Sequence, residues 1–236
     1  MFAKMIKYLN YLYRTPGDIV QILIGAWPGP LGFRLRYAFW KKRLKFLGNQ
    51  VKIDIGVHFQ NPQYISIDDK VWIDKGVIII AGPDKSQRKR RLIQNSNFTL
   101  KRGEVHIGKS VHIGPYTIVS GIGGVYISDR STLSANVKIY SFSHHYKSDE
   151  NPSDKRIGFG SMIDNEMQFM IEGPVFLGRN VGVAITANIL PGVSIRQDSF
   201  VKIGSVVNSS FEENSLIAGN PAERIKERYK YPESDN

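Results

Sequence analysis

Two adjacent histidines, His144 and His145, stand in a short polar run from Ser143 to Tyr146. Histidine changes charge close to neutral pH, so its side chain can take a proton from a reacting group and later return it. An alcohol is a weak nucleophile until such a base removes its proton. The run is therefore a candidate site for general base catalysis on a hydroxyl group, with a turn-capping or surface histidine as the alternative interpretation.

The residues on both sides of this run follow a six-residue period. Aliphatic side chains return at every sixth position from Leu177 to Val207, and the same spacing occurs over residues 67–79, 107–119 and 127–139. A period of six fits neither a helix nor an alternating strand; each hexad is a short strand followed by a bend, and three hexads close a triangular coil of about 18 residues. The pattern predicts an all-β fold, a parallel β-helix of about six coils. A two-residue slip at 121–124 is expected to be a bend.

Two segments, residues 81–104 and 140–174, leave this period, and the second contains both histidines of the run. Excursions from a rigid stack are common places for functional residues. We therefore expect an N-terminal helical, basic and aromatic segment over 1–48, a β-helix catalytic domain over 49–218, and a tail over 219–236. Asn220-Pro221 resembles an N-cap followed by the first helical residue, which predicts a short C-terminal helix from Ala222 to Lys230.

Metal chemistry is disfavoured by the same pattern. The 236-residue chain has no cysteine, which excludes a disulfide scaffold, a thiolate zinc site and a cysteine nucleophile. His106 and His112 are six residues apart, so their rings should point about 120° apart on different faces of the coil. We expect no metal, and a zinc hydrolyase of the same fold is a minor alternative.

The hexads, the excursion with its histidines and the tail Ala218-Gly219-Asn220-Pro221-Ala222 together resemble the hexapeptide-repeat acyltransferases, whose fold is a left-handed parallel β-helix. Within that family the chain is similar to sugar and polysaccharide O-acetyltransferases related to galactoside and maltose acetyltransferases. The resemblance implies a homotrimer that moves an acetyl group from acetyl-CoA to a hydroxyl of a sugar in a surface polysaccharide or its precursor. A sugar-amine N-acetyltransferase is one alternative, and a non-catalytic β-helix scaffold that docks on a membrane or a partner is another.

The resemblance also implies roles for particular residues. The family's catalytic histidine follows Ser or Thr at the start of the excursion, which is His144 here, and direct transfer with this general base is expected. Acceptor contacts are expected from Ser143, His145 and Tyr146. In the family, CoA lies between two subunits along the C-terminal coils, and a backbone amide near Ile185 would stabilise the oxyanion. The matching cofactor-binding positions are Ala184, Ile185, Lys202, Gly204, Ser205, Asn220 and Arg224.

The chain departs from the family's pattern beside this cofactor stretch. Asn208-Ser209 replaces a Thr-Lys pair that relatives often carry. The CoA phosphates therefore need another cation, for which Lys202, Arg224 and Lys226 are the candidates.

Half of the 32 basic residues lie in two segments. Residues 1–48 contain nine of them, one acid and 10 of the 26 aromatic residues; residues 85–102 contain seven and no acid. Such segments attract anionic membranes or polyanions, and solvated basic faces are the alternative. The first segment has the composition of an interfacial membrane anchor, although its aromatics are equally suited to cap the open end of a β-helix.

Two further expectations concern partners and location. The run Arg88–Arg91 lacks interleaved aromatic residues, which argues against nucleic-acid binding. The apolar stretch from Ile19 to Trp27 is too short to span a bilayer and is a poor secretory signal. We expect a cytoplasmic protein, with the inner face of the membrane as the alternative location.

Overall fold

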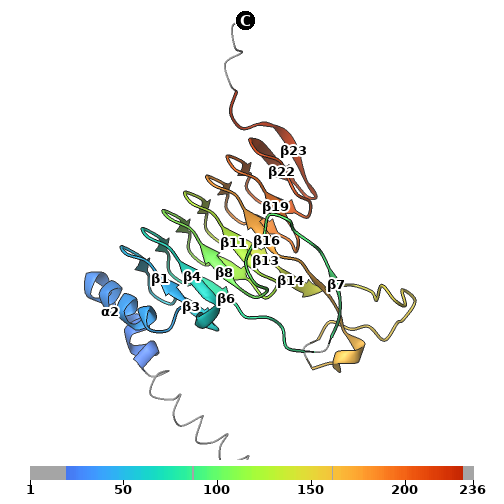
Figure 1. Ribbon diagram of the computed structural model, residues 1–236, viewed down its shortest axis with the longest axis horizontal. Helices are drawn as coiled ribbons and strands as arrows, with labels where there is room; N and C mark the ends of the chain where they lie inside the picture. The colour runs from blue at the N-terminus through green and yellow to red at the C-terminus, as the bar shows by residue number, and fades with distance from the viewer. Residues whose placement is uncertain (1–19, 87, 161, 231–236) are drawn as a thin grey trace, which may run out of the picture.

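The computed structural model describes residues 20–86, 88–160 and 162–230. Strands of successive hexads fall in turn on three parallel sheets around one hydrophobic interior, an arrangement that fits a parallel β-helix (Figure 1). Sheets 1, 2 and 3 are numbered in the order in which the chain reaches them. Sheet 1 contains β1 (Phe46–Leu47), β4 (Ile65–Ile67), β8 (Val105–Ile107), β11 (Val125–Ile127), β16 (Val175–Leu177) and β19 (Ser194–Ile195).

Sheets 2 and 3 continue each coil in the same sequence. Sheet 2 contains β2 (Lys52–Ile53), β5 (Trp72–Ile73), β9 (His112–Ile113), β12 (Thr132–Leu133), β17 (Gly182–Val183), β20 (Phe200–Val201), β22 (Ser215–Gly219) and β23 (Ala222–Glu227). Sheet 3 contains β3 (His58–Gln60), β6 (Ile78–Ile80), β10 (Ile118–Ser120), β13 (Lys138–Tyr140), β18 (Asn188–Ile189) and β21 (Val206–Val207). A 3-10 helix, η1 (Pro62–Tyr64), precedes β4.

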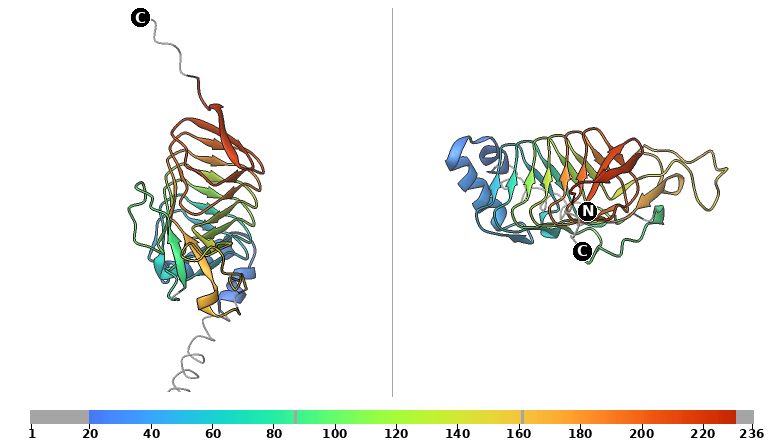
Figure 2. Two further views of the ribbon diagram at one scale, coloured as in Figure 1. Left: turned by 90° about the vertical axis from the view of Figure 1, so that its right-hand side faces the viewer. Right: turned by 90° about the horizontal axis from the view of Figure 1, so that it is seen from above.

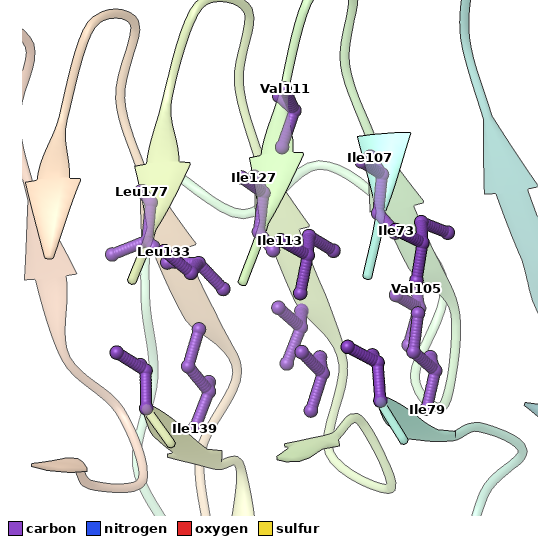
Figure 3. Close-up of a cluster of buried hydrophobic side chains, with 14 of the residues drawn as sticks. Ile73, Ile79, Val105, Ile107, Val111, Ile113, Ile127, Leu133, Ile139 and Leu177 are labelled. Carbon is purple, nitrogen blue, oxygen red and sulfur yellow. The ribbon is translucent and has the colours of Figure 1, made fainter. Parts of the chain in front are cut away.

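The predicted hexad positions form the interior. In sheet 1, Ile107 pairs with Ile127 and Ile127 with Leu177, so that the aliphatic side chains of successive coils stack on one another. Figure 3 shows these stacks inside the coils. Full burial stabilises each such side chain by about 1.5–3 kcal/mol relative to exposure. The side chains of the predicted period from Leu177 to Val207 are all buried: Leu177, Val183, Ile189, Ile195, Val201 and Val207.

Residues 20–44 cover the open end of this interior, and residues 1–19 of the segment predicted to be helical lie outside the described residues. Residues 20–26 are helical, and α2 (Gly29–Lys41) follows them across the end of the coils (Figure 1). Phe39, Trp40 and Leu44 are buried and join the core of the β-helix. The capping interpretation is therefore confirmed for these residues. The parallel pairing already begins at Phe46, inside the segment predicted to be helical.

A buried arginine ties this cap together. The Arg36 guanidinium donates to the carbonyl oxygens of Ile53 (2.6 Å), Trp27 (2.7 Å) and Ile24 (3.1 Å). Burial lowers the pKa of Arg36, and the charge of nearby Asp54 acts in the opposite direction. Because three carbonyls accept hydrogen bonds from Nε and Nη1, the cost of burying the charged group is partly offset.

The C-terminal helix predicted from Ala222 is wrong. Residues 222–227 form strand β23, which pairs antiparallel with β22 and places Arg224 opposite Ile217. β22 already pairs with β20 on one side. Without β23, the backbone N–H and C=O groups on its other side would have no partner in the sheet, which is unfavourable. Pairing across the end of sheet 2 therefore outweighs the local helix signal at Asn220-Pro221.

The two excursions join rather than lying apart. β7 (Lys89–Leu92) of the first pairs parallel with β15 (Phe169–Glu172) of the second, and β15 pairs antiparallel with β14 (Phe142–His144). A 3-10 helix, η2 (Asn165–Met167), precedes β15. This small sheet projects from one edge of the β-helix (Figures 1 and 2).

The first excursion returns across the coils after β7. Phe98 lies so close to Gly124 that a Cβ there would come within 2.2 Å of its ring, and Gly124 has a φ of 109°. Asn95 donates to the carbonyl of Pro174 (2.9 Å) and Asn97 to the hydroxyl of Ser194 (2.9 Å). The glycine-rich slip predicted as a bend therefore also makes room for a crossing segment. Within the described residues, no helix is both long and apolar enough to cross a membrane.

Candidate functional site

The small three-stranded sheet holds His144 at the end of β14, opposite Met170 of β15. Phe142 and His144 share one face of β14, since successive side chains of a strand alternate. Phe142 of β14 and Phe169 and Met170 of β15 are buried. His144 is thus held by a strand pair of the second excursion, against which β7 of the first excursion is paired.

Gln168 is the polar partner of the His144 ring and is only 2% exposed. His144 Nε2 lies 3.2 Å from Gln168 Oε1, and the same oxygen accepts a hydrogen bond from Arg88 at 3.0 Å. The Gln168 amide nitrogen donates to the carbonyl of Ile163 at 2.5 Å. The Arg88 guanidinium can only donate and the Ile163 carbonyl can only accept, so these two partners fix which end of the Gln168 amide is the oxygen. That oxygen is the atom that faces His144. A neutral His144 therefore carries its proton on Nε2 and leaves Nδ1 as the acceptor.

Arg88 is held in turn by the first excursion. It forms an ion pair with Asp84 at 3.2 Å and donates to the Ser86 hydroxyl at 2.7 Å, which itself donates to Asp84 at 2.5 Å. Burial disfavours the charged carboxylate, but the hydrogen bonds from Ser86 and Arg88 outweigh it and lower the pKa of Asp84. A line of polar groups thus runs from Asp84 through Arg88 and Gln168 to His144.

The other predicted acceptor residues lie around His144 in different settings. Ser143 is exposed on the opposite face of β14 from His144. His145 is 8% exposed, and its Nδ1 lies 2.8 Å from the carbonyl of Lys147. Its ring packs edge-on against Phe169, so little of it is open to a ligand. Tyr146 is exposed beside it.

The apolar side chains of the second excursion divide into two groups. Phe169 and Met170 are buried and anchor the small sheet. Phe159, Met162 and Met167 are exposed, and the Phe159 ring meets His144 edge-on at 6.5 Å between centroids. Of the exposed side chains, Phe159 therefore lies near the histidine, while buried Met170 lies opposite it in the sheet.

The basic run of the first excursion is neutralised, which corrects the expectation of an open basic face there. Lys89 pairs with Glu150, Arg91 with Asp149, and Arg90 with Glu172 at 2.9 Å. The hydrogen bond from Arg91 lowers the pKa of Asp149. These cations therefore bind the second excursion to the first. Arg102 is a second partner of Glu172, whose side chain is 3% exposed.

The predicted cofactor positions gather on one edge of the β-helix, between sheets 2 and 3. Ala184 and Ile185 form one corner, and Lys202, Gly204 and Ser205 form the next, joined by a hydrogen bond from the Gly204 N–H to the Ile185 carbonyl at 3.0 Å. Ile185 is exposed. Asn220 follows β22 directly, and Arg224 lies on β23.

Within one chain, these corners and His144 lie at opposite edges of sheet 3. Strands β13 and β18 are parallel neighbours in that sheet. Ile185 precedes β18, at the edge where the strands begin, whereas His144 follows β13, beyond the edge where they end. The structure therefore brings the cofactor positions together with one another, but not with His144.

His106 and His112 are separate from this site. His106 lies on sheet 1 beside Asp68 (3.3 Å), and His112 on sheet 2 beside Asp74 (2.9 Å). The expectation that the two rings lie on different faces is confirmed. In the part of the chain that the structure describes, no three His, Asp or Glu residues gather in a way that suits a metal ion.

Gln168 and Arg88 were not predictable from sequence. They are separated by 80 residues, and neither belongs to a motif that marks it as a partner of a histidine. The only local signal was the excess of cations in one excursion and of carboxylates in the other, which indicates that the two segments attract each other.

Comparisons with known proteins agree with this architecture, although no family model matches the chain. It is 28% identical over 188 residues to a dTDP-4-amino-4,6-dideoxy-D-glucose acyltransferase of Escherichia coli, covering 79% of this chain and 83% of that relative. It is 27% identical over 125 residues, 53% of this chain and 61% of the relative, to WbbJ of Escherichia coli, which is named as a lipopolysaccharide biosynthesis O-acetyl transferase.

Solved structures share the fold. AntD, an N-acyltransferase from Bacillus cereus solved with dTDP and coenzyme A, has a TM-score of 0.65 at 24% identity and covers 82% of this chain and 89% of AntD. A maltose O-acetyltransferase from Clostridium difficile has a TM-score of 0.52 at 19% identity, covering 91% and 85% of the two chains. The homologues of this chain are thus acyltransferases of the hexapeptide-repeat family, and the resemblance predicted from its hexads and tail motif is confirmed.

Proposed function

We propose that the chain transfers an acetyl group from acetyl-CoA to a hydroxyl of a sugar in a surface polysaccharide or its precursor, without a metal. The observation that supports this most directly is His144, which Gln168 holds in the tautomer that leaves Nδ1 free to accept a proton. In this proposal the catalytic part is the β-helix with its two excursions, and its coil is left-handed, as the family resemblance implies.

His144 acts as the general base of a direct transfer. Its Nδ1 takes the hydroxyl proton while the acceptor oxygen forms a bond to the thioester carbonyl carbon. The carbonyl oxygen becomes an oxyanion, which needs a fixed hydrogen-bond donor. The carbon–sulfur bond then breaks, and protonated His144 returns its proton to the departing thiolate, which leaves an ester and free CoA.

The Ile185 backbone amide is the proposed oxyanion donor. It lies on an exposed corner, and among the described residues it has no hydrogen-bond acceptor. Because Ile185 and His144 lie at opposite edges of sheet 3, one chain does not bring this donor to the base. We propose that a second copy of the chain supplies it, in a homotrimer with one site at each interface.

The acceptor is proposed to be a sugar, because the relatives named above act on sugars or in lipopolysaccharide synthesis. Transfer to an amino group is the second candidate, favoured by the relative that is named for an amino sugar. A positioned base is the feature that a hydroxyl acceptor needs more, because an alcohol is the weaker nucleophile.

Acceptor choice is tested by measuring CoA release with a panel of sugars. The panel includes dTDP-4-amino-4,6-dideoxyglucose and its counterpart with a hydroxyl in place of the amine. Since the chain has no cysteine, a thiol reagent reports only the CoA that is released. We expect faster release with the hydroxyl sugar. If only the amino sugar releases CoA, the proposal is replaced by N-acylation. If none of the sugars causes CoA release, the non-catalytic scaffold is favoured.

The role of His144 is tested by His144→Ala. Turnover should fall by roughly 10² to 10⁴, as expected for loss of a positioned base, while acetyl-CoA affinity hardly changes. His58→Ala, at an exposed histidine of β3 outside the site, is the matched control and should keep its turnover. Full activity of the His144 variant would exclude this base.

A further inference from the structure

The N-terminal cap has two different sides. On α2, Gly32, Arg36, Phe39 and Trp40 are buried against the β-helix. Leu31 and Leu35, one helical turn apart, lie on the side that faces solvent. The cap therefore accounts for only part of the apolar surface of this segment.

The helical residues before α2 add further apolar side chains at the same end of the molecule. Ile22 is 71% exposed and Leu23 63%, and Trp27 is half exposed. Figure 2 shows this segment at the end of the β-helix, away from the small sheet that bears His144. Exposed aliphatic groups on a short helical segment, with an exposed indole directly after it, are suited to the boundary between headgroups and acyl chains.

The charge around these side chains has a single sign. Arg34, Lys42 and Arg43 are exposed on or just after α2, and residues 20–48 contain no Asp or Glu. In the part of the chain that the structure describes, Arg34 and Lys42 form no ion pair. The basic run of the first excursion, by contrast, is neutralised by carboxylates. Over residues 20–48 the exposed apolar groups thus have only cations, and no carboxylate, beside them in the sequence.

We propose that this outer side of the cap binds the surface of an anionic lipid bilayer. Ile22, Leu23 and Trp27 insert at the headgroup boundary, while Arg34 and Lys42 contact the lipid phosphates. The inner side of the same segment keeps the β-helix closed, so binding does not require the cap to open. The proposal is independent of the acyl transfer, and it places the chain where a lipid-linked acceptor would be presented.

Vesicle sedimentation with the full chain tests this surface, using phosphatidylcholine alone and phosphatidylcholine mixed with phosphatidylglycerol, with no acyl donor or acceptor present. The intact protein should bind the anionic vesicles, and I22S/L23S should bind them at least about tenfold more weakly, because it removes the apolar groups that insert. Ile225→Ser removes an aliphatic group that is also largely exposed, at 58%, from β23 near the opposite end of the molecule, and should bind like the intact protein.

A charge-reversal pair separates the electrostatic contribution. Each cation near an anionic membrane strengthens binding roughly fivefold. The R34E/K42E variant should therefore bind anionic vesicles more weakly by at least that factor for each residue changed, at low salt. The difference from the intact chain should become smaller as the salt concentration rises. K70E/K109E makes the same change at two exposed lysines on the β-helix and should bind nearly as the intact chain does.

Several results would overturn the proposal. One is equal binding of the intact chain to neutral and anionic vesicles, and another is a loss of binding in the control variants as large as that in the test variants. Unchanged binding of I22S/L23S would have the same consequence. Thermal unfolding separates the two sides of the cap: Trp40→Ala should be destabilised, and I22S/L23S should not. If I22S/L23S unfolds as easily as Trp40→Ala, or changes the oligomeric state, those residues belong to the cap or to a contact between copies.

Discussion

The properties of His144 depend on a glutamine that is invisible to motif analysis. Gln168 is fixed by Arg88 on one side and by the Ile163 carbonyl on the other, so its oxygen alone is available to the histidine. The tautomer of a neutral imidazole follows from such a partner. Gln168 is therefore a positioning residue for His144, and it acts without touching the acceptor.

Replacing Gln168 by leucine tests this role. The Gln168→Leu variant loses the acceptor for Nε2–H, and we expect kcat to fall about threefold to tenfold, the value of one hydrogen bond, with little change in KM. Nitrogen-15 NMR of the histidines should show a mixture of His144 tautomers in place of one. Gln168→Glu keeps an acceptor oxygen and should restore the Nε2–H form. An unchanged His144 spectrum in Gln168→Leu would contradict the assignment.

At the scale of elements, the two excursions are joined by ion pairs as well as by the pairing of β7 with β15. Glu172 of β15 is 3% exposed and pairs with Arg90 of β7 and with Arg102. Arg90 also lies 3.2 Å from Asp84, which belongs to the polar line that ends at His144. The small sheet therefore has one buried charged cluster, around Glu172, in which removal of one partner leaves the others unpaired.

Comparing Glu172→Gln with a substitution at an exposed ion pair tests whether the buried ion pair contributes more to stability. We expect a loss of about 3 kcal/mol in the free energy of unfolding, since two guanidinium groups lose their carboxylate. Faster hydrogen exchange should appear over residues 89–92. Glu212→Gln is the matched control, because Glu212 is 75% exposed and pairs with Arg196 on the surface; it should change stability by less than about 1 kcal/mol. Equal effects of the two variants would mean that the sheet does not depend on the buried pair.

At the scale of the whole molecule, a complete site requires two chains in our proposal. The base and the proposed oxyanion donor lie at opposite edges of sheet 3, and a closed symmetric ring of three copies would create three equivalent interfaces. Light scattering should then give about three times the chain mass of 26.7 kDa.

Mixing two inactive variants tests the shared site directly. His144→Ala lacks the base, and Ile185→Arg places a bulky charge on the exposed corner. Co-expressed, they should form mixed trimers in which about a quarter of the interfaces combine an intact base with an intact corner, so about a quarter of the activity returns. Each variant alone should stay inactive. No recovery from trimers shown to contain both chains would mean that each site is built from a single chain.

The sequence alone determined the architecture of the β-helix and the position of the candidate base. The reason is that a six-residue period is local: every hexad carries its own inward aliphatic residue, and each side chain of the series from Leu177 to Val207 is indeed buried. The excursions were equally visible, because they are the places where this period stops. The resemblance to acyltransferases rested on the same local features.

Only the tertiary structure decided how the segments without a period are arranged. The pairing of β7 with β15, the partnership of Gln168 with His144 and the neutralised basic run all join residues far apart in the chain. The tail became a strand because the end of sheet 2 offered backbone partners that outweighed a local helix signal. Contacts of this kind depend on which surfaces the finished coils bring together, and no spacing within the sequence specifies that.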